Sequence, residues 1–169
     1  EVDCQRIKQF LEEEPNLLLR DNVKMHFTAS AWVLNPSKDK VLMLYHNIYQ
    51  SWSWSGGHAD GEGDLLSVAM KEVKEESGLV SLKPLSDSPI SIEILGVQPH
   101  YKKQKYVSAH MHLNYTFLLH NTKEEKLKIC PEENSKVGWL SPDEAVRSST
   151  EAWMKPIYEK LNQKMKEYL

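Results

Sequence analysis

Apolar residues recur at every second position in several parts of the chain, which is the pattern of β-strands. In the segment MHFTASAWVLN, residues 25–35, Phe27, Ala29, Ala31 and Val33 follow this period. The turn NPSKD and the segment KVLMLYH come next, so we predict a β-hairpin. The other segments rich in β-forming residues are QSWSWSGG, PISIEILGVQPHY, KYVSAHMHLNYTFLLHN and SKVGWLS.

A helical period of apolar residues marks other segments of the chain. Residues 2–19 predict a helix that is interrupted around Pro15. A central helix has Asp64 as its expected N-cap and Gly78 as its expected terminating residue. The apolar stripe of this central helix consists of Leu66, Ala69, Met70 and Val73.

Two more helices are predicted near the C-terminus. Ser141, Pro142 and Glu144 form a capping-box pattern at the start of the first. Residues 150–169 predict a long amphipathic helix in which Pro156 introduces a kink. The apolar stripe expected for it is Trp153, Ile157, Leu161 and Met165. The order helix, strands, helix, strands, helix indicates an α+β fold with a mixed sheet between helices.

The length and net charge of the chain limit the number of domains and the classes of partner that we expect. The chain has 169 residues, which suits one domain with at most a short extension. Its formal net charge of −3 gives no overall basic field, which argues against nucleic-acid polymers and membranes as partners. No apolar run is long enough to span a bilayer, and there is no signal-peptide pattern. We interpret Cys4 and Cys130 as free thiols, with one disulfide as the alternative, and expect a cytoplasmic protein.

The central helix carries three acidic residues on one face. Glu72, Glu75 and Glu76 stand at i, i+3 and i+4, where like charges destabilise a helix by a few tenths of a kcal/mol per pair, roughly. They also lie toward the C-terminal end, where the helix dipole disfavours anions. A solvated face softened by Lys71 and Lys74 is the ordinary explanation of such a pattern.

The loop before this helix, GGHADGEG at residues 56–63, favours a different explanation. Its glycines let bare backbone approach a ligand closely. Carboxylates that face loop carbonyls offer the oxygen ligands that Mg²⁺ prefers, together with waters and substrate phosphates. Such a cation polarises a phosphoryl oxygen and activates water. There is no Walker loop, zinc-spaced His/Cys set or G-x-S-x-G elbow to suggest other chemistry.

The loop and helix together resemble the Nudix box. The family's pattern is G, five residues, E, seven residues, R-E, an aliphatic residue, any residue, E-E, any residue, G and an aliphatic residue. Gly57 opens the box here, and KEVKEESGL at residues 71–79 closes it in register. Two positions depart from the pattern, since Gly63 replaces the first Glu and Lys71 the Arg. We expect a slow enzyme, because a lysine that faces no carboxylate and lacks the planar fork orients Glu72 less firmly.

The resemblance implies an α/β/α sandwich around a mixed sheet. Residues 1–22 would then be an N-terminal helical extension, and residues 23–169 the Nudix-type hydrolase domain with its C-terminal helix. It also implies hydrolysis of a nucleoside diphosphate-linked or similarly phosphorylated small molecule, with water attacking a diphosphate phosphorus and with Mg²⁺ or Mn²⁺ as cofactor. The implied catalytic and metal-binding residues are the Gly57 carbonyl, Glu72, Glu75 and Glu76.

Residues outside the three glutamates are weaker candidates. The resemblance implies a further acid or base outside the box, for which we select Glu132 or Glu133, and Glu133 in particular; an ordinary polar turn explains them equally well. Trp52 or Trp54 either stacks on a base or packs in the core. The residues selected for substrate binding are Lys71, His58 and Trp54.

Two polar groups on the long β-rich segments have two interpretations each. The lysines of the KKQK turn either meet a polyphosphate or form a solvated turn. His110 and His112 share one face of a strand, and form either a second metal site or a pair of ordinary sheet histidines.

We predict an enzyme, a Nudix-type diphosphatase. The alternative is a Nudix-fold nucleotide-binding or regulatory module with little or no turnover. Gly63 and Lys71 favour this alternative, and the intact three-glutamate face opposes it. An isomerase of the same fold ranks third, because no cysteine lies near the box to transfer a proton.

Overall fold

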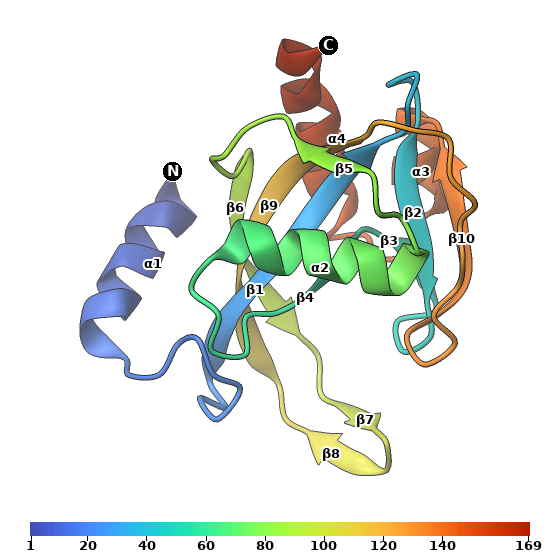
Figure 1. Ribbon diagram of the computed structural model, residues 1–169. Helices are drawn as coiled ribbons and strands as arrows, with labels where there is room; N and C mark the ends of the chain where they lie inside the picture. Colours follow the sequence, from blue (N-terminus) through green and yellow to red (C-terminus); the bar gives the residue numbers. More distant parts are fainter.

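The structure is a computed structural model that describes residues 1–169 (Figure 1). Its helices are α1 (Val2–Glu13), α2 (Leu65–Ser77), α3 (Pro142–Ser148) and α4 (Lys155–Lys164), and a short 3₁₀ segment (Met165–Tyr168) continues the last. Its strands are β1 (Met25–Leu34), β2 (Val41–His46), β3 (Ser51–Ser53), β4 (Ser55–His58), β5 (Leu82–Pro84), β6 (Ser91–Val97), β7 (His100–Lys102), β8 (Lys105–Val107), β9 (His110–Asn121) and β10 (Asn134–Leu140).

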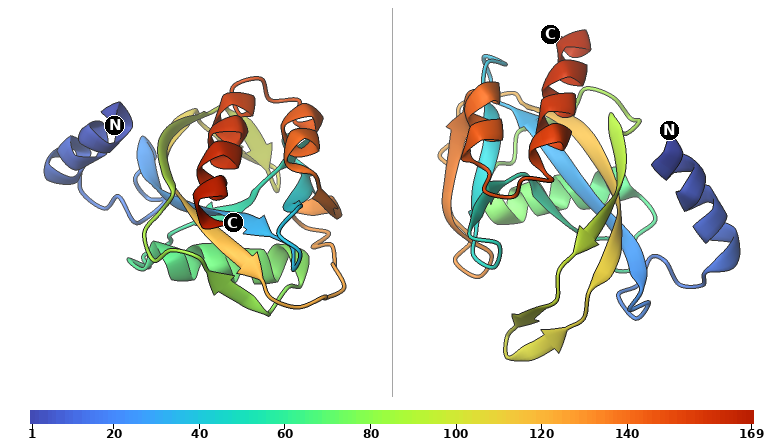
Figure 2. Two further views of the ribbon diagram at one scale, coloured as in Figure 1. Left: turned by 90° about the horizontal axis from the view of Figure 1, so that it is seen from above. Right: turned by 180° about the vertical axis from the view of Figure 1, so that it is seen from behind.

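A mixed sheet forms the middle layer of the molecule. Its strand order is β10-β2-β1-β9-β5, while β3 pairs with β2, β4 with β1 and β6 with β9. Helix α2 covers one face, and α3 and α4 cover the other, as the left view of Figure 2 shows. The predicted α+β fold and α/β/α sandwich are therefore confirmed. The small hairpin of β7 and β8 projects away from the sheet below α2 (Figure 1).

Strand β1 lies at the centre of the sheet and is buried along its whole length. It pairs in parallel with β9 and antiparallel with β2 and β4. The predicted period of two is present, but both faces of the strand are buried, so alternate residues pack into two different layers of the core. One face contacts α2 through Ala29, Ala31 and Val33, and the other contacts α4 through Trp32 and Leu34.

The predicted ends of the central and third helices are confirmed. The Asp64 side chain caps α2 by accepting from the Ser67 amide at 3.1 Å. Gly78 ends α2 with φ of 76°, a left-handed conformation that glycine adopts without steric cost. Ser141 and Glu144 form the reciprocal capping box of α3.

The two terminal helices differ from their predictions. Helix α1 ends at Glu13, and Leu17 lies buried beyond it, with its carbonyl accepting from the Phe27 amide at 2.7 Å. Pro156 lies in the first turn of α4, where a missing N–H costs nothing, so it starts the helix and does not kink it. Trp153 precedes α4 and is 59% exposed. The residues buried from this segment are Met154, Tyr158, Leu161 and Met165.

The structure also tests the remaining expectations. The segment QSWSWSGG forms two short strands, β3 and β4, which pair with different partners. Cys4 and Cys130 are free thiols, so the disulfide alternative does not apply. Measured by length and apolar character, none of the helices could cross a membrane.

Candidate active site

Strand β4 brings the glycine loop against the glutamate face of α2. The strand is fixed by its antiparallel pairing with β1, in which Ala29 faces Gly57 across the ladder. A Cβ on Gly57 would lie 2.3–2.6 Å from the carboxyl atoms of Glu72. Glycine at this position therefore leaves the space that the Glu72 carboxyl group occupies beside the loop backbone.

Glu76 is the most buried of the three glutamates, with 6% of its surface exposed. Its Oε2 accepts hydrogen bonds from Ser55 Oγ at 2.5 Å and from the Gly56 amide at 3.2 Å. Burial raises the pKa of the Glu76 carboxyl to about 8, and the nearby Glu72 adds to this rise while the Ser55 hydrogen bond opposes it. Near neutral pH this group therefore favours either a proton or a neighbouring cation.

Glu72 and Glu75 form the more accessible part of the face. Burial raises the pKa of Glu72, and the charge of Glu75 raises it further. Glu75 is exposed, and its Oε1 lies 3.8 Å from Lys71 Nζ. The expectation that Lys71 faces no carboxylate is therefore wrong, because Glu75 lies one helical turn further on. Such an exposed pair contributes little to stability.

Glu133 reaches the same place from the residue directly before β10, an edge strand of the sheet. Its charge contributes to the raised pKa values of both Glu72 and Glu76. Asn134 holds this segment against α2, because its Nδ2 donates to the carbonyl oxygen of Glu76 at 3.0 Å. The structure thus places Glu133 near Glu72 and Glu76.

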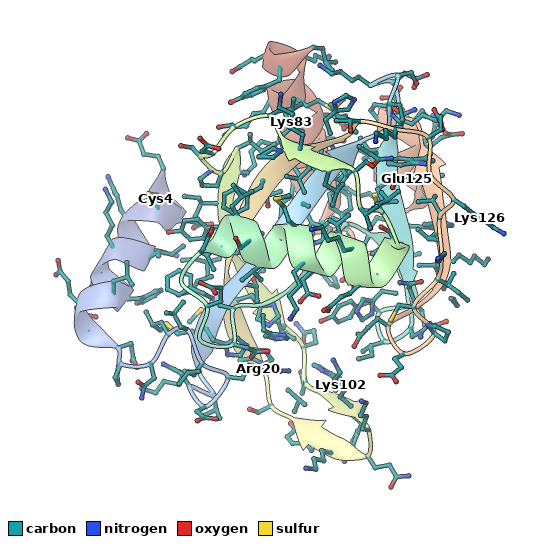
Figure 3. The ribbon with its side chains drawn as sticks, in the orientation of Figure 1. Cys4, Arg20, Lys83, Lys102, Glu125 and Lys126 are labelled. Atoms are coloured by element: carbon teal, nitrogen blue, oxygen red, sulfur yellow. The ribbon has the colours of Figure 1, made fainter.

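The β7–β8 hairpin contributes basic residues beside this cluster. Lys102 Nζ lies 3.6 Å from Glu133 Oε1, and Figure 3 labels Lys102 beside β7, at the end of that strand. Lys103 Nζ lies 3.7 Å from Glu132 Oε2, and both of those side chains are exposed. Of the two candidate acids, Glu133 is the one that lies near the box glutamates.

The carboxylate and carbonyl oxygens at this place are suitable ligands for a hard divalent cation. Glu76 uses Oε2 for its hydrogen bonds, and its Oε1 accepts none. Burial raises the pKa values of Glu72 and Glu76 because it disfavours the charged carboxylates, and a bound cation would offset that cost. Carboxylate and backbone carbonyl oxygens are the ligands that Mg²⁺ and similar cations prefer.

The residues selected for substrate binding are not gathered at one point. The Trp54 ring lies 5.5 Å from the Tyr158 ring, and its amide donates to Tyr158 Oη at 3.3 Å, which favours the core interpretation of this tryptophan. His58 lies on the other face of β4 from the glutamates, with its ring 5.0 Å from that of His112. Lys71 lies on the exposed surface of α2.

Sequence reasoning missed the residues that hold the glycine loop in place. Arg20 forms two hydrogen bonds of 2.7 Å with the Asp60 carboxylate, and the Gly61 amide donates to the Leu18 carbonyl at 2.9 Å. Ser55 was also missed, although the alternation in SWSWS places it on the strand that enters the loop. The Arg20–Asp60 pair left no local signal, because its members are 40 residues apart.

Comparison with known proteins agrees with this geometry. A family model described as the NUDIX domain matches residues 24–161, so the chain belongs to the Nudix family. No curated protein sequence matches the chain significantly.

Several solved structures share the fold. An Ap4A hydrolase from C. elegans is 18% identical, with a TM-score of 0.61 over 83% of this chain and 98% of that one. A NUDIX-family hydrolase from Clostridium perfringens is 18% identical, with a TM-score of 0.63 over 85% of this chain and 98% of that one. The E. coli dihydroneopterin triphosphate pyrophosphohydrolase is 17% identical, with a TM-score of 0.57 over 79% of this chain and 92% of that one.

Proposed function

We propose that this chain is a Nudix-type diphosphatase that hydrolyses a nucleoside diphosphate-linked or similarly phosphorylated small molecule. The observation that carries the proposal is the gathering of four carboxyl groups, from Glu72, Glu75, Glu76 and Glu133, beside a glycine loop. Membership of the Nudix family supports the reaction class. The names of two structures with the same fold, the Ap4A hydrolase and the dihydroneopterin triphosphate pyrophosphohydrolase, agree with the substrate class.

In this proposal the glutamate face and the loop hold the cofactor, Mg²⁺ or Mn²⁺. The ligands are the Gly57 carbonyl oxygen and the carboxylates of Glu72, Glu75 and Glu76. When bound, the cation supplies Lewis-acid polarisation of a phosphoryl oxygen and a lowered pKa for bound water. Ser55 and the Gly56 amide hold Oε2 of Glu76, which leaves Oε1 of that carboxylate for the cation.

Glu133 is the proposed proton acceptor of the reaction. Water forms a new bond from its oxygen to phosphorus, the anhydride P–O bond breaks, and the bridging oxygen leaves with the electron pair. The proton of the water passes to the Glu133 carboxylate. Lys102, 3.6 Å from that carboxylate, and the neighbouring Lys103 provide positive charge for the phosphates of the substrate.

The first test is a screen of nucleoside diphosphate derivatives with Mg²⁺ and with Mn²⁺, in which phosphate-containing products are measured. We expect metal-dependent turnover that falls by about a hundredfold or more in Glu76→Gln, because a neutral amide does not replace an anionic ligand. Nucleotide binding without products would support the binding-module alternative. Unchanged turnover and metal affinity in both Glu72→Gln and Glu76→Gln would contradict the assignment of the site.

The proton acceptor is tested by a matched pair of neighbours. Glu133→Gln should lower kcat by a factor on the order of 10²–10⁴, which is the usual contribution of a general base. Glu132→Gln is the control, because Glu132 is exposed and pairs only with Lys103. Equal effects of the two substitutions would show that Glu133 has no special role.

A further inference from the structure

Four histidines gather on the face of the sheet that is turned away from α2. The parallel ladder between β1 and β9 places His26 opposite His112, and His110 lies two residues earlier on the same face of β9. The ring of His26 lies 4.9 Å from that of His110 and 5.1 Å from those of His58 and His112. The rings of His110 and His112 are 5.0 Å apart.

Three of these histidines turn ring nitrogens toward one another. One nitrogen each from His26, His110 and His112 lies within 4.8 Å of the other two. The Nε2 atoms of His110 and His112 are 3.1 Å apart. Ligand nitrogens around a tetrahedral Zn²⁺ lie about 3.4 Å apart, so side-chain shifts of roughly an ångström would complete such a site.

The outer hydrogen bonds of two rings leave the Nε2 lone pairs of His26 and His110 turned away from the backbone. That of His110 accepts from His112 Nε2, 3.1 Å away, so a bound cation would take the place of the proton between these two rings. His26 Nδ1 lies 3.0 Å from the Asn22 carbonyl oxygen, and His110 Nδ1 lies 2.8 Å from the Ser108 carbonyl oxygen. A carbonyl accepts only, so Nδ1 carries the proton in both rings and Nε2 carries a lone pair. Metal-binding histidines in proteins are fixed in this way, with the outer N–H donated to a carbonyl or carboxylate.

His26 shows the clearest sign of a missing partner. Its side chain is buried, with 4% of the residue exposed, yet Nε2 has no hydrogen-bond partner. A buried polar atom of this kind is costly unless it binds something.

We propose that His26, His110 and His112 form a second metal site, separate from the glutamate face, which takes Zn²⁺ or a transition-metal cation of similar ligand preference. Imidazole nitrogen suits Zn²⁺, Ni²⁺ and Cu²⁺, whereas Mg²⁺ and Mn²⁺ prefer oxygen. Three histidines leave the fourth tetrahedral position to water or to another ligand. The cation joins the beginning of β1 to the beginning of β9, so it adds stability to the folded chain.

The experiment measures Zn²⁺ binding to the full chain after removal of metals with EDTA. The titration is done in excess Mg²⁺, which keeps the glutamate face occupied. We expect one Zn²⁺ per chain and a rise in the melting temperature on its addition, since a ligand of the folded state stabilises it by mass action. Substitution of Co²⁺ should give the intense visible absorption of a tetrahedral nitrogen-ligated site.

Matched variants separate this site from other histidines. His110→Ala and His112→Ala, both at half-buried positions, should each weaken Zn²⁺ binding by more than about a hundredfold, because loss of an outer partner alone costs ten- to a hundredfold. His120→Ala is the control, since His120 lies on the same strand and contacts the Pro36 carbonyl, outside the cluster. It should leave Zn²⁺ affinity unchanged, as should Glu76→Gln.

Three results would overturn the proposal. They are the absence of saturable Zn²⁺ binding in excess Mg²⁺, equal losses of affinity in His110→Ala and His120→Ala, and loss of Zn²⁺ binding in Glu76→Gln. If His110→Ala does not fold, His110→Gln gives the same test with a side chain of similar size. None of these readouts depends on the hydrolytic activity.

Discussion

The glutamate face and the histidine cluster meet at two consecutive residues of β4. Gly57 lies against Glu72 on the α2 side, and His58 lies beside His26 and His112 on the other side. Successive residues of a strand point to opposite faces, so this one short strand borders both the glutamate side chains and the histidine side chains. One set offers carboxylate oxygens, and the other offers imidazole nitrogens.

Burial acts on the two regions in opposite senses. It raises the pKa of Glu76 because it disfavours the charged carboxylate, and it lowers the pKa of His112 because it disfavours the charged imidazolium. A bound cation would therefore offset the cost of the buried Glu76 charge, whereas the neutral form of His112 that burial favours has a lone pair to offer. Burial thus has opposite effects on the charge of the two kinds of group that the proposed oxygen and nitrogen sites contain.

Of the effects that separate the two regions, the largest should come from a methyl group placed against the glutamate face. In Gly57→Ala the new Cβ meets the Glu72 carboxyl group, which must move, and kcat should fall by about a hundredfold, as displaced catalytic groups do. The fold should persist, because the displaced atoms are the end of a flexible side chain. Zn²⁺ binding at the histidine cluster should be unchanged, which calorimetry would check.

Gly63→Ala is the control for this substitution. A Cβ at Gly63 meets no atom within 4 Å, and its φ is not positive. Because the substitution restricts the unfolded chain, we expect it to leave activity intact and to stabilise by about 0.4–1 kcal/mol. If Gly63→Ala lowered kcat as much as Gly57→Ala, the contact with Glu72 would not be the cause.

The pH dependence of stability in the metal-free protein should separate the two regions. Glu76 has a raised pKa in the folded state, so its contribution is present below pH 4.5 and is lost as the pH rises toward about 8. His112 has a lowered pKa, so its contribution is present above pH 6.5 and is lost as the pH falls toward about 2. Each effect is on the order of a few kcal/mol at its extreme.

Denaturant unfolding in the presence of EDTA, repeated at a series of pH values, measures how the free energy of unfolding changes with pH. Glu76→Gln should flatten the loss of stability between pH 4.5 and about 8. His112→Gln should flatten the loss on the acid side and leave the other side unchanged. A Glu76→Gln protein with the full wild-type slope above pH 4.5 would assign the effect to other groups.

A smaller effect should come from restoring the two departures from the Nudix box. Gly63→Glu has open space, and Lys71→Arg adds a planar fork near Glu75. We expect the double substitution to raise kcat by more than the two single ones together, with a coupling on the order of 1 kcal/mol. A double-mutant cycle on kcat measures it, and strict additivity or no gain would contradict the slow-enzyme hypothesis.

The smallest effect concerns the start of α2. Asp64→Ala removes the hydrogen bonds to the Ser67 amide and hydroxyl, and should cost about 1 kcal/mol of unfolding free energy. Asp64→Asn, which keeps the cap, is the matched control. The kcat of folded Asp64→Ala should equal that of the wild type, and a large loss would mean that Asp64 replaces the missing box Glu.

Local signals in the sequence predicted much of the fold. The alternation in β1, the cap at Asp64, the left-handed Gly78 and the capping box at Ser141 each depend on residues within one segment. The prediction at Pro156 was wrong because a proline stops a helix or starts one according to where the helix begins. Packing of Met154 and Tyr158 against the sheet decided that point.

The glutamates of the box could be found from sequence because they lie on adjacent turns of one helix. The sequence by itself therefore determined the family, the helix and the acidic face. Glu133, Arg20 and the histidine cluster come from distant segments, and sequence spacing does not say which of them meet. Only the tertiary structure decided that β1, β4 and β9 bring His26 together with His58 and His112, because the pairing register of strands far apart in the chain sets those distances.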